Sequence, residues 1–446
     1  MEHLPSDMRM AAARMSNYNR NKFRLETVSA DTAGPGRIVT VNLPENALLD
    51  MKSLRLHMDV LTTSSTEGAA TVYGRLPADA SSLISRLEVY CNGIQLTQGA
   101  AEYGTIAKLL KVCRSSRDKD GSVDRALSHG SVSATDAVED VSLVISDWKG
   151  FLGECSTRFL PTDLLGQIQI RITFAGNEVL VPKEAAVGLN ANFGSADART
   201  AAARVSYSVS EMYWSIDSVQ IDDTYSQLLR QRLAQEEFIP LNYKEYYSWS
   251  LDNITTGSHT VRFSLSAASI DRLYATCRDS NHQTAGVRGF QMDATLADNL
   301  GSNALRFRNF NDSTTKAGSL RYQWSINNVK RPQYRASVID ALADLAHAGD
   351  KVHDSSSGNL VTSLAQYSDG LFVCPLQLSH PGEPIAVQSG YSSKGINTSL
   401  LLEISGQTVP TASTAAQTTA AISTFVVAET TAQLRVGLGR NIAISF

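Results

Sequence analysis

Residues 205–249, close to the midpoint of the 446-residue chain, most strongly constrain the fold that this chain can adopt. Apolar and polar residues first alternate with a period of two, and the alternation changes phase once near residues 210–211. This pattern is typical of a long strand with one buried face and a bulge at the phase change. A helical pattern over residues 222–233 follows, and a second strand pattern starts at Phe238. We therefore expect a hinge between two β-domains of nearly equal size.

The length of the chain makes two domains the natural division. A chain of 446 residues is too long for one hydrophobic core. Hydrophobic residues make up 43% and charged residues 19%, a balance that is typical of a globular chain and not of a disordered one. We expect residues 1–36 to form a flexible arm, residues 37–235 the first domain and residues 236–446 the second.

Charge and cysteine content argue against several classes of protein. The net charge of −4 gives no global reason to expect nucleic-acid binding. The cysteines are scattered and form no C-x-x-C pair, which favours buried free thiols in a reducing compartment. No apolar run reaches the roughly 18 residues of a membrane-spanning helix, so we predict no membrane span. The five cysteines are Cys91, Cys113, Cys155, Cys277 and Cys374.

The N-terminal segment is basic, and its charges interrupt any apolar core of a secretory signal. Tyr18 and Phe23 lie among these charges, so the segment has the composition of an arm that contacts nucleic acid or a neighbouring subunit. A cleaved transit peptide and a solubilising tail are the alternatives. We favour an arm that becomes ordered only on assembly. The positive residues before residue 25 are Arg9, Arg14, Arg20, Lys22 and Arg24.

Short alternating segments dominate the first half of the chain. The clearest is residues 167–174, where three isoleucines and a phenylalanine alternate with polar residues. We expect a short helix running into a strand at residues 82–90, a hairpin turn at Asn92-Gly93 and a helix over residues 103–112. Further strands are expected at residues 37–43, 53–58 and 141–145, and loops at 62–71, 114–140 and 183–203.

The second half repeats this plan loosely, and residues 269–275 weakly echo residues 82–90. A helix is expected over residues 337–346, where apolar residues lie on one side. Residues 407–424 are almost all Thr, Ala, Ser and Gln, which is typical of an exposed loop. Strands are expected at residues 260–265, 320–326, 400–404, 425–428, 434–438 and 442–446. Many short strands with few short helices predict an all-β sandwich or jelly roll.

The sequence contains none of the common catalytic motifs. The zinc-protease, Walker A and nucleophile-elbow patterns are absent, and Gly437-Leu-Gly439 lacks the third glycine and the helix of a dinucleotide site. His347 and His353 have no nearby cysteine or carboxylate cluster to complete a metal site, so we expect a solvated pair. We predict no catalytic, cofactor-binding or metal-binding residues.

Two groups near the hinge support alternative hypotheses. Asp217, Asp222 and Asp223 could serve a carbohydrate hydrolase, since paired carboxylates cleave sugars, but two of them also precede the predicted helix and could cap it. An aromatic group could stack on sugars or bases, with sugar binding expected of a receptor-binding protein, or it could lie in a half-buried strand or a domain interface. This group comprises Tyr243, Tyr246, Tyr247 and Trp249.

Several stretches resemble one protein family. Residues 43–56 (LPENALLDMKSLRL) resemble the first strands of double jelly-roll major capsid proteins, and residues 83–94 (LISRLEVYCNGI) are similar to the strand and turn that follow there. Residues 159–166 (FLPTDLLG) are similar to the later part of that first roll, and residues 212–247 to the passage into the second. The resemblance covers most of residues 37–250 and is nearest to polinton-like viruses and virophages.

This resemblance implies an all-β fold of two tandem eight-stranded jelly rolls with a few short helices. It implies no enzyme but a capsid protein of eukaryotic double-stranded DNA viruses, which forms homotrimers of pseudo-hexagonal outline. Such trimers tile an icosahedral shell with a penton protein and minor or cement proteins. We therefore expect the protein in the virion, made in the host cytoplasm or nucleus. A β-sandwich carbohydrate-binding or carbohydrate-hydrolysing protein is the alternative.

Overall fold

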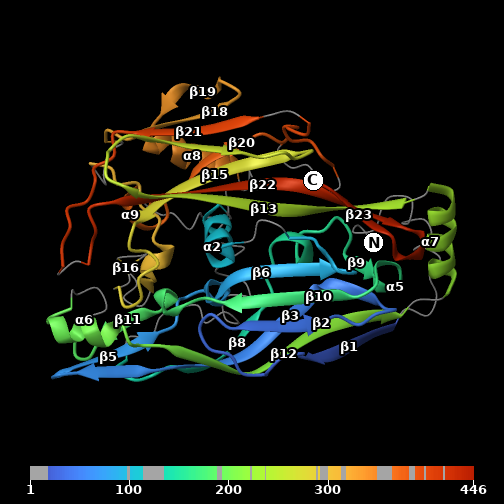
Figure 1. Ribbon diagram of the computed structural model, residues 1–446, viewed down its shortest axis with the longest axis horizontal. Coiled ribbons are helices and arrows are strands. Elements are labelled where there is room, and N and C mark those ends of the chain that lie inside the picture. Colours follow the sequence, from blue (N-terminus) through green and yellow to red (C-terminus); the bar gives the residue numbers. More distant parts are fainter. Residues whose placement is uncertain are drawn as a thin grey trace.

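A computed structural model gives the fold of the chain. Figure 1 shows two stacked halves whose strands run along the long axis of the molecule, with helix α2 (Tyr103–Val112) between them. The described residues are 19–97, 101–113, 135–187, 193–220, 223–236, 238–287, 290–291, 300–312, 318–348, 364–380, 387–395, 398–414 and 417–446.

The first half contains two antiparallel sheets. Sheet I has the strand order β1-β12-β3-β8, with the short strand β9 also paired to β3, and sheet II has the order β2-β10-β6-β7. Their strands are β1 (Asn19–Glu26), β2 (Ile38–Asn42), β3 (Leu48–Thr62), β6 (Ile84–Cys91), β7 (Ile94–Gln95), β8 (Asp140–Ile145), β9 (Phe159–Pro161), β10 (Ile168–Phe174) and β12 (Tyr207–Gln220).

The second half contains two further antiparallel sheets. Sheet III has the order β13-β22-β15-β20, with β23 also paired to β22, and sheet IV has the order β14-β21-β18-β19. Their strands are β13 (Phe238–Ile254), β14 (His259–Ser264), β15 (Ile270–Asp279), β18 (Arg321–Ile326), β19 (Val329–Ala336), β20 (Cys374–Gln377), β21 (Ser399–Ser405), β22 (Ile422–Gly437) and β23 (Ile442–Ser445).

The two halves have the same topology. If the eight main strands of each half are numbered in chain order, sheets I and III both read 1-8-3-6, and sheets II and IV both read 2-7-4-5. Eight antiparallel strands that alternate between two sheets in this way form a jelly roll. The predicted fold class, an all-β chain of two tandem eight-stranded jelly rolls, is therefore confirmed.

Shorter elements lie outside the eight main strands of each roll. β4 (Ser64–Glu67), β5 (Ala70–Arg75) and β11 (Val181–Glu184) form a small sheet, and β16 (Phe290–Gln291) pairs with β17 (Leu300–Gly301). The other α-helices are α5 (Thr162–Leu165), α6 (Ala196–Ala202), α7 (Asp223–Glu236), α8 (Val338–Ala348) and α9 (Leu364–Gly370). The 3-10 helices are η1 (Ala80–Leu83), η2 (Gly150–Leu152), η3 (Asn177–Val179), η4 (Asn303–Leu305) and η5 (Leu438–Arg440).

Most local expectations are confirmed. Side chains along β10 alternate between buried and half-buried, and α2 spans the residues expected for it. The register between β12 and β3 shifts between Ser210 and Tyr213, and Glu211 has a φ of 50°, so the phase change marks a bulge. The other expected strands and helices overlap β2, β3, β6, β8, β14, β15, β18, β21, β23, η1, α7 and α8.

The expectation of a flexible arm over residues 1–36 is wrong for β1. This strand pairs with β12 along its whole length and is the first of the eight strands of the first roll. Its composition misled the prediction, because β1 is an exposed edge strand whose charged side chains face solvent. Residues 1–18 lie outside the described residues, and the division of the chain at residues 235/236 stays a prediction.

Three further expectations are corrected. Residues 62–71 contain β4 and the start of β5, which pair as a hairpin, instead of a plain loop. Residues 183–203 contain α6, which Ser195 caps by accepting a hydrogen bond from the backbone N of Ala198 at 3.0 Å. The strands expected at residues 425–428 and 434–438 form one strand, β22, which already begins inside the expected loop 407–424. Residues 114–134 of the expected loop 114–140 lie outside the described residues.

Candidate functional site

Helix α2 belongs to both rolls and forms the centre of the seam between them. Tyr103 and Ala107 pack in the hydrophobic core of the first roll, whereas Ile106, Leu109 and Leu110 pack in the core of the second. Spacings of three and four place these two sets on different sides of the helix. Every other residue of α2 is buried apart from the half-buried Lys111. The two rolls are therefore joined by shared apolar packing and not by a linker alone.

An ion pair connects the start of α2 to the second roll. Arg278 on β15 donates from Nη1 to Glu102 Oε2 at 2.8 Å, and its side chain is 1% exposed. Its guanidinium carbon also lies 4.8 Å from the ring centroid of Phe425. Burial alone would raise the pKa of Glu102, but the Arg278 guanidinium outweighs burial and holds that pKa below its usual value. The pair is charged and fixes the orientation of α2 against sheet III.

Backbone contacts continue the seam beside α2. The backbone N of Ser156 donates to Asn242 O at 2.7 Å, and the backbone N of Lys244 donates to Glu154 O at 3.1 Å. The Tyr246 hydroxyl donates to Glu154 Oε2 at 2.7 Å. A short segment of the first roll thus pairs with β13 of the second, which limits relative motion of the rolls.

A buried charge cluster holds β13, β15 and β22 together. Lys244 Nζ lies 2.7 Å from Asp271 Oδ2 and 3.2 Å from Glu429 Oε1, and Thr431 Oγ1 donates to the same Asp271 oxygen at 2.5 Å. Burial alone would lower the pKa of Lys244, but Glu429 and Asp271 outweigh burial and raise it. These contacts satisfy the polar middle of β22, which explains why that strand continues through residues that suggested a break.

Within the described residues, the carboxylates predicted near the hinge (Asp217, Asp222 and Asp223) do not form a cluster. Asp217 lies on β12 in an ion pair with Arg20, and its side chain is 14% exposed. Asp50, from β3, accepts two hydrogen bonds from Arg158 at 2.9 and 2.8 Å and lies 3.4 Å from the same Arg20. Asp222 lies outside the described residues, as does the side chain of Asp223. Capping of α7 by these two residues stays a prediction.

The aromatic group lies largely inside the molecule. Tyr243 is 0% exposed, and its hydroxyl donates to Leu96 O at 3.1 Å, so it belongs to the seam. Tyr246 is buried there as well, and Tyr247 and Trp249 are half-buried. The Trp249 and Phe263 rings lie 4.6 Å apart. The domain-interface alternative, stated from the sequence for this group, fits Tyr243 and Tyr246.

The remaining predicted features are placed as follows. His347 lies on α8, its side chain and all of His353 being outside the described residues. Among the described residues, no group of three or more His, Cys, Asp or Glu side chains is placed to hold a metal ion. No helix in the described part of the chain is long and apolar enough to cross a membrane. All five cysteines are free thiols, and burial raises the pKa of Cys91 to about 12.

Sequence reasoning missed the charged residues of the seam. Arg278 follows an apolar run in β15, and Lys244 stands among the aromatic residues of β13. A charge within a buried strand pattern is a usable signal, because such a charge requires a partner. The identity of that partner has no local signal, since Glu102 lies 176 positions from Arg278.

No family model matches the chain, and no curated protein matches its sequence. The strand order places the chain in the class of double jelly-roll folds that viral major capsid proteins have, as the sequence resemblance implied.

Three solved structures with this fold resemble the chain over almost its full length. The PBCV-1 virus capsid protein is 12% identical with a TM-score of 0.57, covering 97% of this chain and 98% of its own. The Faustovirus major capsid protein is 10% identical with a TM-score of 0.53, covering 95% and 91%. A chain of the Sputnik virophage structure is 12% identical with a TM-score of 0.52, covering 97% and 89%. At sequence identities this low, the structural similarity establishes the fold of the chain.

Proposed function

We propose that this chain is a viral major capsid protein whose homotrimers tile an icosahedral shell around a DNA genome. The observation that carries the proposal is the fusion of two jelly rolls of identical strand order through a buried seam. Three such chains supply six similar rolls, so a trimer acquires a pseudo-hexagonal outline that can tile a surface. In this proposal the chain is a structural protein and not an enzyme.

Rigidity supports this role. A shell subunit must keep its shape while it contacts many neighbours, and the seam joins the rolls by apolar packing, backbone hydrogen bonds and a buried charge pair. Each roll is a double-sheet jelly roll, an arrangement that viral capsid domains use to manage sheet edges. Loops at the ends of the strands can then vary without disturbing the shell.

The proposal implies a set of partners and a location. The chain would contact itself in the trimer and in neighbouring trimers, and it would meet a penton protein at the vertices and minor or cement proteins between trimers. The basic residues before β1 would contact the genome or a neighbouring subunit. The protein would reside in the virion after synthesis in the host cytoplasm or nucleus.

Two measurements on the purified protein test the proposal. Analytical ultracentrifugation at micromolar concentration should give a stable trimer, and negative-stain microscopy should show hexagonal particles with three-fold symmetry or closed shells. A clean monomer that appears as isolated globules would contradict the proposal. It would return attention to the carbohydrate alternative, which a glycan array tests directly.

A further inference from the structure

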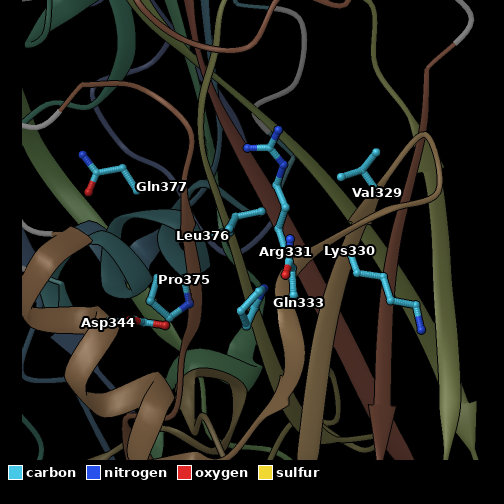
Figure 2. A pocket seen from close by; sticks show the side chains of 9 residues that line it. Val329, Lys330, Arg331, Gln333, Asp344, Pro375, Leu376 and Gln377 are labelled. Atoms are coloured by element: carbon cyan, nitrogen blue, oxygen red, sulfur yellow. The ribbon is translucent and has the colours of Figure 1, made fainter.

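The second roll is open on the side where the edges of its two sheets approach each other. Within the described residues, sheet IV ends at β19 and sheet III ends at β20, and α8 lies beside both strands. A hollow of about 530 Å³ lies between these elements, lined by residues 329–333, Asp344 and residues 375–377 (Figure 2). Hollows of this volume commonly hold a ligand or a short piece of a partner.

Two cations line the hollow and have no partner among the described residues. Lys330 and Arg331 on β19 are exposed, and neither side chain has an ion pair or a hydrogen bond with any described residue. An unpaired cation in a recess attracts a negatively charged group, and the attraction is stronger there than on an open surface because less water surrounds the pair. The β19 wall of the hollow is therefore suited to an acidic partner.

The acidic groups nearby leave these two cations uncompensated. Asp344, the acid in the lining, lies on the opposite wall of the hollow, on α8 (Figure 2). Asp340 of the same helix accepts hydrogen bonds from the backbone N and the hydroxyl of Ser337, both at 2.8 Å. Glu403 on β21 lies 3.8 Å from Arg335, the third cation of β19.

The rest of the lining is largely apolar. Val329 is 58% exposed at the edge of the hollow, Leu376 is half-buried, and Pro332 and Pro375 complete the apolar part. None of the nine lining residues is aromatic, so the hollow offers no ring on which a nucleic-acid base could stack. Exposed apolar groups beside unpaired cations fit a protein segment that has both acidic and apolar side chains.

The backbone of β19 is available to such a segment as well. Asn327 and Asn328 join β18 to β19, and their φ values of 48° and 66° are those of a two-residue type I′ turn. Ile326 and Val329, which flank the turn, are then a hydrogen-bonded pair, and Lys330 takes the next position, which is not hydrogen-bonded across the pair. The N–H and C=O groups of Lys330 therefore point away from β18, toward the open edge of the sheet.

We propose that this hollow binds an extended segment of another protein that carries two adjacent acidic residues beside an apolar one. Such a segment adds as a strand to the free edge of β19, where residues directly opposite each other share a face. Its acidic residues then lie opposite Lys330 and Arg331, and its apolar residue lies opposite Val329 and enters the hollow against Leu376. This inference goes beyond the proposed function, because it concerns a different protein and holds for a single chain as well as for a trimer.

Charge selects this occupant over a second copy of β19. The strand has three cations and no acidic residue, so two copies placed edge to edge would bring like charges together. Cations and proline on an edge strand oppose such self-pairing, and β19 has Pro332 beside its two hollow-lining cations. An acidic strand is attracted by the same charges that repel another β19.

The first experiment measures the binding of a labelled peptide. The probe is the octapeptide Ser-Thr-Val-Glu-Glu-Val-Thr-Ser carrying fluorescein. Its Val-Glu-Glu-Val centre reads the same in both directions and so suits a parallel or an antiparallel strand. Fluorescence anisotropy should show saturable binding to the wild-type protein that weakens as salt is added. Lys330→Glu and Arg331→Glu should each raise the dissociation constant at least about tenfold, with circular dichroism unchanged.

Arg262→Glu is the matched control. Arg262 is an exposed cation on β14 of the same sheet and lies outside the lining of the hollow, so its reversal should change the dissociation constant by less than about twofold. Two altered peptides test the chemistry of the segment. A peptide with Lys-Lys in place of Glu-Glu should not bind. N-methylation of the central backbone should weaken binding although the charges are unchanged, because a methylated nitrogen donates no hydrogen bond to β19.

The outcomes decide between occupants of the hollow. Absence of saturable binding at millimolar peptide would overturn the inference, as would equal binding of the lysine peptide or an equal loss in Arg262→Glu. Tighter binding of a labelled oligothymidylate of the same length would assign the cations to nucleic acid instead. Self-association of the chain that Lys330→Glu abolishes would assign the hollow to a second copy. Peptide binding by a wild-type monomer would keep the inference while removing the proposed trimer, so the two can fail separately.

Discussion

Two groups of charged residues in this protein join partners from distant parts of the chain. Arg278 meets Glu102 in the seam, and Lys244 meets Glu429 and Asp271 between strands of the second roll. A buried charge without its partner is costly, so each of these residues depends on correct packing of the others. We therefore expect that replacing one member of such a pair lowers the free energy of unfolding, because its partner then stays behind without a counter-charge.

Arg278→Met should lower the free energy of unfolding by about 3 kcal/mol, because it leaves the Glu102 carboxylate in the seam without its guanidinium. The midpoint of urea unfolding measures the change. The matched control is Arg204→Met, which removes an ion pair with Glu67 whose side chains are 57% and 38% exposed, and which should cost less than about 1 kcal/mol. Equal losses in the two variants would contradict a special role for the seam pair.

His259 should make the second roll sensitive to acid. Burial lowers its folded-state pKa to about 4 from an ordinary value of 6.5. The unfolded chain therefore binds a proton first as the pH falls, so stability is complete above pH 6.5 and declines between pH 6.5 and about 4. His259→Gln should reduce the drop in melting temperature between pH 7.5 and pH 5. An unchanged drop would assign the acid sensitivity to other groups.

At the scale of elements, β1 shows how an edge strand can have the composition of a tail. Its charged side chains face solvent, and its backbone pairs with β12 over eight residues. It also brings Arg20 to Asp217 and to the buried Asp50. The element is structural although its sequence has no apolar alternation strong enough to reveal it.

Removal of residues 1–26 should therefore destabilise the first roll. The deletion leaves one side of β12 unpaired and takes Arg20 away from Asp217 and Asp50, so we expect a clear fall in melting temperature and aggregation through the open edge. Light scattering during a thermal ramp measures both effects. A chain lacking only residues 1–18 is the control, because it keeps every contact described for β1. Equal stability of the two truncated chains would support the flexible arm first expected from the sequence.

At the scale of the whole molecule, the two rolls share a topology but not an independent core. The core of the second roll includes five residues from α2 and its end, which belong to the first half of the chain. Each half has its full set of eight strands. The second half nevertheless lacks a complete core of its own, because part of that core comes from the first half. The seam therefore joins the two rolls through a core that both halves of the chain share.

A fragment of residues 236–446 should fold poorly by itself, because the apolar surface that α2 covers would be exposed. We expect it to be soluble only when residues 1–235 are co-expressed with it, with the two fragments eluting together in size-exclusion chromatography. A monomeric fragment that unfolds cooperatively alone would instead support two independent domains divided at residues 235/236.

The sequence alone determined the elements with a strong local period. The alternation in β10, the apolar spacing in α2 and the phase change before Glu211 depend on residues close in sequence, and each element formed where its pattern predicted. Only the tertiary structure decided the place of β1, the continuity of β22 and the pairing of Arg278 with Glu102. These features depend on strand register and on burial against segments far away in the chain, and no local pattern encodes them.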